Sequence, residues 1–111
     1  MENIKRYGQV IRLRPEMEET YRRLHANPWP CVLEMIRRCH IRNYTIFLLE
    51  NHTLFAYFEY TGNDFEGDMW RMSEDECTRR WWKETAPCQE TLSPDPASWW
   101  LNMEEVFHAD G

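Results

Sequence analysis

Tyr21 and His25 stand four positions apart in the stretch YRRLHANPWP, residues 21–30, directly before a run that contains two prolines and a tryptophan. In an α-helix, side chains at this spacing lie on the same face, so the phenol and the imidazole can converge on one small ligand. Histidine has an ordinary pKa of about 6.5, which lets it take up and release a proton near neutral pH. A single histidine at a helix end is more often structural, so helix-end packing and proton transfer in a pocket both stay open as interpretations.

The tryptophan pair Trp81 and Trp82, in RRWWK, forms a second group of candidates. Successive helix positions differ by about 100° around the axis, so both rings cannot point straight into one core. One interpretation is a buried ring beside a ring at the border of the core. The other is an aromatic wall for a sugar, because sugars present an apolar face of C–H groups and a rim of hydroxyls. Tyr44 and Asn43 are candidates for the polar groups of such a site. Together these residue types favour a neutral polar ligand that undergoes proton transfer at most.

Length and charge exclude several classes of protein. A chain of 111 residues is expected to form a single domain, residues 1–111, because a split would leave each half too small for a core. The formal net charge is −6 and no basic run is present, which opposes binding to nucleic acid. No apolar stretch approaches the ~20 residues of a membrane span, and the N-terminal stretch MENIKRYGQV lacks the apolar segment of a signal peptide. We therefore expect a cytoplasmic protein with no membrane partner.

The cysteines of the chain, Cys31, Cys39, Cys77 and Cys88, form no CxxC pair. In a reducing compartment they are expected to be buried thiols rather than disulfides or zinc ligands. The histidines outside the first motif are too scattered to suggest a metal site, and no glycine-rich loop is present to hold phosphates. The sequence therefore predicts a site that has no metal and no cofactor.

The elements that must position these residues follow from the periodicity of the first half of the chain. Residues 6–15 alternate as a strand, which places Tyr7, Gln9, Ile11 and Leu13 on one side. A first helix is expected from Pro15 to His25, and a second helix after the proline-rich turn, ending near His40. Residues 43–50 and 53–60 are rich in aromatic and β-branched residues and predict an antiparallel hairpin.

The second half of the chain returns to helical character. Residues 64–85 are expected to be helical, with Asp75 as a cap before ECTRRWWKETA. Residues 87–98 contain three prolines and predict a surface loop, and residues 100–109 predict a final strand. The order β, α, β, β, α, β is that of the ferredoxin-like α+β fold, with an antiparallel sheet.

Both faces of the hairpin are largely apolar. Tyr44, Ile46 and Leu48 alternate with Thr45, Phe47 and Leu49, and the next strand continues the pattern. Helices of a ferredoxin-like unit cover only one face of the sheet, so the other face must be covered by a partner, line a pocket or stay exposed. A homodimer with facing sheets is the simplest of these solutions.

Several motifs resemble those of the L-rhamnose mutarotase family. They are YRRLH followed by Trp29 and Pro30, NY at residues 43–44, CTRRWWK at residues 77–83 and MEEVF at residues 103–107. Their order and approximate spacing are kept over nearly the whole chain. The chain departs from the family pattern after His25, where Ala26 precedes the Asn and Pro that directly follow the histidine in the relatives, so L-fucose or another related hexose is an alternative substrate.

The resemblance implies a ferredoxin-like homodimer of the dimeric α+β barrel type that needs no cofactor. It implies an isomerase of rhamnose metabolism that interconverts the α and β anomers of a 6-deoxyhexose monosaccharide. It also implies that His25 is the proton donor and that the sugar-binding residues are Tyr21, Tyr44, Trp81 and Trp82. Trp29, fixed beside them by the proline-rich turn, is a further sugar-binding candidate.

Mutarotation requires a proton to leave the anomeric hydroxyl and another to reach the ring oxygen, after which the aldehyde turns and the ring closes on its other face. We expect His25 to supply the acid and Tyr21 to orient the sugar or relay the proton. The base is a carboxylate of the last strand, Glu104 or Glu105, or a bound water. Two other functions fit the same fold expectation: a cofactor-free monooxygenase acting on an aromatic substrate, and a sugar-binding or interaction module without catalysis.

Overall fold

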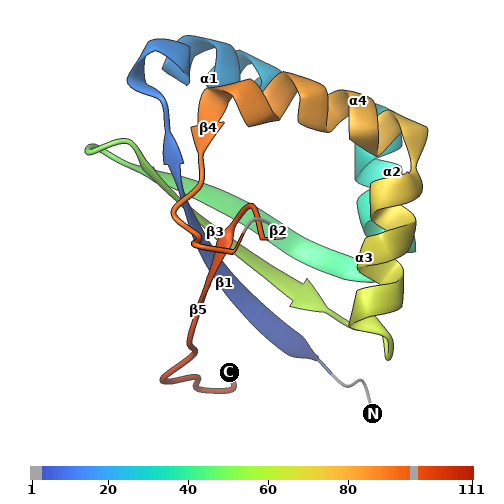
Figure 1. The fold of residues 1–111 in the computed structure, drawn as a ribbon. Coiled ribbons are helices and arrows are strands. Elements are labelled where there is room, and N and C mark those ends of the chain that lie inside the picture. Colours follow the sequence, from blue (N-terminus) through green and yellow to red (C-terminus); the bar gives the residue numbers. More distant parts are fainter. Residues whose placement is uncertain (1–3, 96–97) are drawn as a thin grey trace.

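The computed structural model describes residues 4–95 and 98–111, and the chain forms an antiparallel sheet with helices packed on one of its faces (Figure 1). In chain order the elements are β1 (Lys5–Leu13), a 3₁₀ turn (Pro15–Met17), α1 (Glu18–Ala26), α2 (Pro30–Arg38), β2 (Ile41–Leu49), β3 (Thr53–Tyr60), α3 (Phe65–Glu74), α4 (Glu76–Thr85), a second 3₁₀ turn (Ala86–Cys88), β4 (Gln89–Glu90) and β5 (Leu101–Met103).

The sheet has the strand order β2-β3-β1, and β4 and β5 both pair with β1, antiparallel to it. The two short strands share the place of the fourth strand of a ferredoxin-like sheet. The predicted α+β fold is therefore confirmed. The predicted hairpin is confirmed as well, because β2 pairs antiparallel with β3 over most of its length.

The face of the sheet that the helices cover carries the core. Ile11 and Leu13 of β1 are 0% and 1% exposed and Arg12 between them is exposed, so the predicted alternation is seen at the end of this strand. On β3 every second residue is buried, which places Leu54, Ala56, Phe58 and Tyr60 under the helices. The burial of these apolar side chains is the main force that fixes the register of the strands.

The helices begin and end where local chemistry requires. Pro15 opens the first 3₁₀ turn, and Pro30 is the first residue of α2, where its missing N–H costs no hydrogen bond. The predicted helical segment 64–85 divides at Asp75, which has extended backbone angles. One carboxylate oxygen of Asp75 accepts hydrogen bonds from the backbone N–H and the hydroxyl of Thr78, each at 2.9 Å, so the predicted cap is confirmed.

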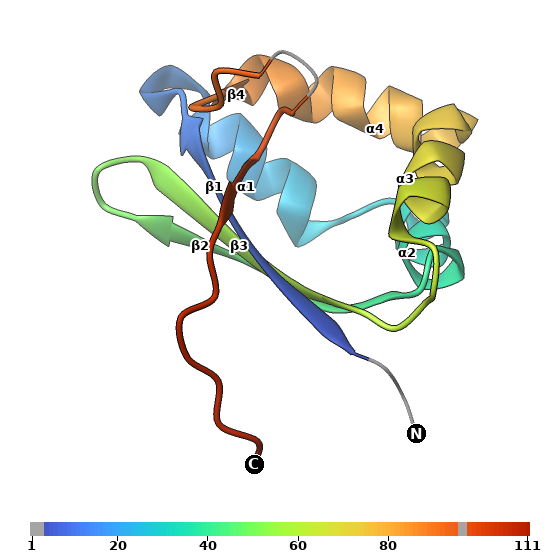
Figure 2. The same ribbon diagram turned by 60° about the horizontal axis from the view of Figure 1, so that its bottom comes forward.

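Two expectations for the end of the chain are wrong in part. The final strand was predicted over residues 100–109, but β5 spans only Leu101–Met103, and the chain beyond it leaves the sheet (Figure 2). Residues 87–98 were predicted to be loop, but Gln89 and Glu90 pair with Leu13 and Arg12 of β1. A pairing of two residues is too short to give a periodic pattern, and residues 96–97 lie outside the described part of the chain.

The prediction that all cysteines are thiols is wrong for one pair. Cys31 of α2 and Cys77 of α4 form a disulfide with a Cα–Cα distance of 6.2 Å, whereas Cys39 and Cys88 are buried free thiols. The two bonded cysteines lie 46 positions apart in the sequence, so only the folded arrangement brings them together. The bond ties α2 to α4.

The other face of the sheet is open (Figure 2). Phe47 and Leu49 of β2 lie on it, 61% and 51% exposed, and the C-terminal segment that follows β5 exposes Val106 and Phe107. Among residues 4–95 and 98–111, none of the helices is both long and apolar enough to cross a membrane.

Candidate functional site

A cavity of about 700 Å³ lies between the helices and the covered face of the sheet. This volume falls within the range of small-molecule sites. Most of its wall is apolar, and its polar lining includes Gln9, Tyr21, His25, Tyr44, Gln89 and Asn102. No Asp, Glu, Lys or Arg side chain of the described residues lines this cavity, so the site suits an uncharged ligand with many hydroxyls.

α1 places Tyr21 and His25 in the cavity, one turn apart as the sequence predicts. The ring centroids lie 4.1 Å apart with an interplanar angle of 31°. His25 Nδ1 lies 2.8 Å from the backbone carbonyl oxygen of Tyr21. A carbonyl only accepts hydrogen bonds, so Nδ1 carries the hydrogen and Nε2 is left to exchange a proton with a ligand.

The protonation states of the site follow from burial. Burial lowers the pKa of His25 below its ordinary value of 6.5, so its imidazole is neutral at pH 7. Burial raises the pKa of Tyr21 above its usual range and raises that of Tyr44 to about 12, so both phenols keep their protons. Among the described residues that line the cavity, His25 is therefore the group whose charge changes near neutral pH.

Tyr44 reaches the cavity through an irregularity in β2. Arg42 pairs with Glu59 and Thr45 pairs with Tyr57, so two residues of β2 face one residue of β3. Such a bulge changes the direction in which the following side chains point. The Tyr44 ring packs 5.6 Å from the ring of Phe58 on the covered face.

The predicted residue Asn43 takes the left-handed backbone conformation at the same bulge, with a φ of 54°. Its side-chain amide donates a hydrogen bond of 2.9 Å to Glu59 Oε1. Glu59 lies between the buried residues Phe58 and Tyr60 and so points to the open face of the sheet. Asn43 consequently does not line the cavity.

Trp81 and Trp82 of α4 point in different directions, as expected for neighbouring helix positions, and both line the cavity. Trp81 is buried, whereas Trp82 is 43% exposed. The Trp81 ring lies edge-on to His25, at a centroid distance of 5.3 Å, and edge-on to Trp29, at 5.2 Å. Trp29 contacts the Trp81 ring but does not line the cavity itself.

The carboxylates expected to act as base lie elsewhere. Neither Glu104 nor Glu105 lines the cavity. Glu105 forms an ion pair of 2.8 Å with Arg6. Within the described part of the chain, no group of three or more His, Cys, Asp and Glu side chains is placed to hold a metal ion.

Several lining residues were missed in the sequence, among them Gln9, Asn102, Gln89 and Trp99. Gln9 donates a hydrogen bond of 2.8 Å to Asn102 Oδ1 across the β1–β5 pairing. Gln89 contacts Tyr21, and Trp99 contacts Gln89. Of these four, Gln9 could have been found from the sequence, because it is a polar residue on the same side of its strand as the apolar residues Ile11 and Leu13.

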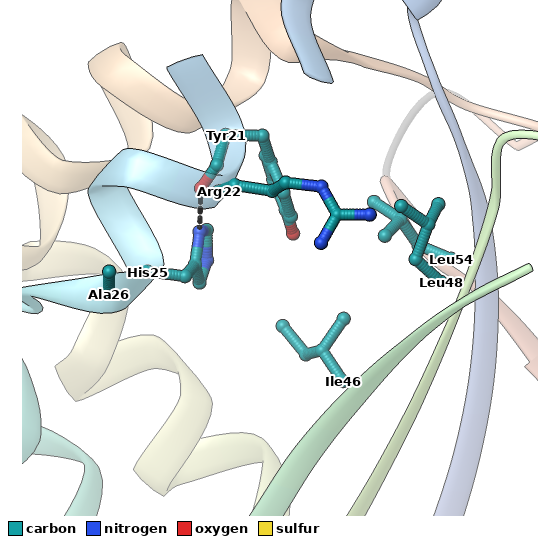
Figure 3. Close-up of a pocket in the computed structure, with 7 residues that line it drawn as sticks. All are labelled: Tyr21, Arg22, His25, Ala26, Ile46, Leu48 and Leu54. Atoms are coloured by element: carbon teal, nitrogen blue, oxygen red, sulfur yellow. Dashed lines mark hydrogen bonds between the residues drawn. The ribbon is translucent and has the colours of Figure 1, made fainter. Parts of the chain in front are cut away.

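A smaller cavity of about 310 Å³ opens between α1 and the β2–β3 hairpin. Figure 3 shows Tyr21, Arg22 and His25 of α1 on one side of it and Ile46, Leu48 and Leu54 on the other. Tyr21, His25 and Ile46 line both cavities. The phenol of Tyr21 and the imidazole of His25 therefore lie where the two cavities meet.

Known proteins resemble this chain in sequence and in fold. L-rhamnose mutarotases from Oceanobacillus iheyensis and Bacillus subtilis are 31% and 32% identical to it, each over 96% of this chain and 100% of the relative. The crystal structure of an L-rhamnose mutarotase from Formosa agariphila has the same fold, with a TM-score of 0.76 and 23% identity over 96% of this chain and 99% of the other. The family model for L-rhamnose mutarotase matches residues 6–109. The chain therefore belongs to the L-rhamnose mutarotase family.

Proposed function

We propose that the protein is an isomerase that interconverts the α and β anomers of a 6-deoxyhexose, with L-rhamnose as the first candidate. The observation that carries the proposal is the neutral imidazole of His25, with Nε2 free, in a cavity lined by two phenols and four indoles and by no described carboxylate. Membership of the family supports the choice of substrate.

The proposed cycle uses His25 in two directions. Because its pKa is lowered, the imidazole starts neutral, and Nε2 accepts the proton of the anomeric hydroxyl as the ring opens. The same nitrogen is then the proton donor to the aldehyde oxygen when the ring closes on the other face. The ring oxygen must receive a proton as its bond to the anomeric carbon breaks, and the protonated phenol of Tyr21 is placed to donate or relay that proton. When the ring closes, the hydroxyl formed from the ring oxygen returns this proton by the same route.

The remaining contacts hold the sugar. Trp81 and Trp82 supply apolar surface for its C–H face, and Tyr44 faces the cavity with a protonated hydroxyl. Glu104 and Glu105 take no part in this cycle, because neither lines the cavity. No carboxylate base is needed when one imidazole both accepts and returns the proton.

Saturation-transfer NMR on a panel of L-rhamnose, L-fucose and common hexoses tests the proposal, because it measures anomer exchange directly. Enzyme-dependent exchange on one or more 6-deoxyhexoses is expected. Sugar binding without exchange on any member would identify a binding module instead. Oxygen uptake with an aromatic substrate would identify a monooxygenase.

Replacing Trp82 with leucine is expected to weaken sugar affinity about 2- to 12-fold, because aromatic contacts of this kind are worth about 0.5–1.5 kcal/mol. Titration of tryptophan fluorescence with the sugar measures the change. The matched control is Trp70→Leu, since Trp70 is 65% exposed on α3 and does not line the cavity. Equal affinities for the Trp82 variant and the parent would rule out an aromatic wall at this position.

We also propose that the protein is a homodimer, with the open sheet faces of two copies packed together. The exposure of Phe47 and Leu49 on that face supports the proposal. Phe47→Asp is expected to shift sedimentation at micromolar concentration from dimer to monomer. Leu33→Asp, on the exposed side of α2, is the matched control and should stay dimeric. A parent protein that sediments as a folded monomer would contradict the proposal.

A further inference from the structure

A hydrogen-bonded chain of three side chains runs along one wall of the cavity. Trp99 Nε1 donates to Gln89 Oε1 at 2.7 Å, and Gln89 Nε2 donates to the Tyr21 hydroxyl at 3.2 Å. All three residues line the cavity. Gln89 and Tyr21 are each only 5% exposed, so water does not compete freely for these bonds.

The donor and the acceptor of each hydrogen bond in this series follow from the chemistry of the three side chains. An indole N–H is a donor only, so the Gln89 atom that faces Trp99 must be the amide oxygen. The NH₂ group of Gln89 therefore faces Tyr21, and since NH₂ only donates, the Tyr21 oxygen must accept. The hydrogen of the Tyr21 hydroxyl is then free to point into the cavity as a donor.

The backbone holds the middle member and one end of this hydrogen-bonded chain in place. Gln89 belongs to β4 and pairs with Leu13 of β1 beneath α1. The carbonyl of Trp99 accepts a hydrogen bond from the Thr91 hydroxyl, which closes the loop that carries Trp99. The tryptophan is thus anchored through its backbone and through its indole.

We infer that Gln89 is a positioning residue that fixes the Tyr21 hydroxyl as a hydrogen-bond donor to the ring oxygen of the sugar and holds Trp99 as a wall of the site. The inference rests on the proposed mutarotation. A sugar ring oxygen carries no hydrogen and only accepts, whereas the anomeric hydroxyl can donate. The donor at Tyr21 and the free nitrogen of neutral His25 therefore match the two oxygens on the anomeric carbon in one orientation.

The first test of this assignment needs no activity. In the sugar-free protein labelled with ¹⁵N, the Trp99 indole resonance, assigned with Trp99→Phe, is expected to move upfield in its proton dimension and to exchange faster with water in Gln89→Met. The Trp70 indole, on α3, is the internal control and should not move. A Trp99 resonance that is the same in both proteins would overturn the inference even if the enzyme is active.

The second test measures whether Gln89 acts through Tyr21. Gln89→Met is expected to lower the enzyme-dependent exchange rate about 3- to 10-fold in the parent, but less than about twofold in a Tyr21→Phe background. Gln9→Met is the matched control: Gln9 lines the cavity and bonds Asn102 rather than Tyr21, so its effect should be the same in both backgrounds. Additive losses for Gln89→Met and Tyr21→Phe would overturn the inference.

Gln89→Glu gives the sharpest contrast, because a carboxylate accepts from both neighbours and keeps the shape of the amide. At pH 8 the Tyr21 hydroxyl would donate to the carboxylate and lose its role as a donor to the sugar. We expect the exchange rate to fall about tenfold further than in Gln89→Met, with the Trp99 indole still hydrogen-bonded. A rate equal to the parent would contradict the inference. If the parent exchanges no sugar, the proposed function fails, and the indole test alone then decides the hydrogen-bonded chain.

Discussion

Replacing His25 with asparagine is expected to lower the enzyme-dependent rate of anomer exchange about 10²–10⁴-fold, the usual contribution of a positioned general acid or base. Asparagine keeps a polar side chain of similar size but cannot take up or release a proton near pH 7. Sugar affinity should weaken by about tenfold at most, because one neutral hydrogen bond is worth about 0.5–1.5 kcal/mol. Exchange is measured by saturation-transfer NMR after subtraction of the spontaneous rate.

The matched control is His108→Asn, because His108 lies on the exposed C-terminal segment, hydrogen-bonds Asp110 and does not line the cavity. This variant should exchange sugar like the parent. If His25→Asn keeps most of the parent rate on every accepted sugar, the proton is handled elsewhere and the assignment of His25 fails.

The pH profile of the parent distinguishes the direction of the first step. Burial lowers the pKa of His25, so its neutral form persists below pH 6.5. Because neutral Nε2 starts the proposed cycle, the rate should stay level on acidification until the pH falls through this lowered pKa, and then decline. A rate that rises on acidification through the same range would show that the imidazolium starts the reaction at the ring oxygen.

Loss of the Cys31–Cys77 disulfide is expected to lower the free energy of unfolding by about 4 kcal/mol. A cross-link between residues 46 positions apart lowers the conformational entropy of the unfolded chain and so favours the folded state. In the folded protein the bond connects α2 to α4. Urea unfolding of Cys31→Ser, Cys77→Ser and the double variant measures the effect. Each single variant should cost about as much as the double variant, because the bond is lost once in every case.

Thiol counting is the independent check on the bond. The denatured, unreduced protein should release two thiols, from Cys39 and Cys88, and the reduced protein four. Four thiols without reductant, together with single and double variants as stable as the parent, would contradict the cross-link.

Much of the fold was predictable because its signals are local. The alternation of β1, the aromatic hairpin and the Asp75 cap each depend on residues that are neighbours in sequence. The short pairing of Gln89–Glu90 with β1 and the early end of β5 depend on contacts between distant segments. The disulfide was missed for the same reason, since no spacing rule joins α2 to α4 across 46 positions.

The candidate site shows the same limit. Tyr21, His25, Tyr44, Trp81 and Trp82 were named from the sequence, and the structure brings them to one cavity. Asn43 was named beside Tyr44, but neighbouring residues of a strand point to opposite faces, and the bulge in β2 places Tyr44 rather than Asn43 on the covered face. Gln89 lies in the segment expected to be surface loop and Trp99 directly follows it, so their roles become visible only once β4 is seen to pair with β1.

The most direct measurement of the central claim is saturation transfer between the two anomeric protons of L-rhamnose, with the purified protein at catalytic concentration and His25→Asn beside it. The account predicts that saturating the proton of one anomer attenuates the signal of the other in proportion to the concentration of the parent protein. It predicts spontaneous exchange alone for the variant. Exchange at the spontaneous rate with the parent protein, on L-rhamnose and on the other 6-deoxyhexoses of the panel, would contradict it.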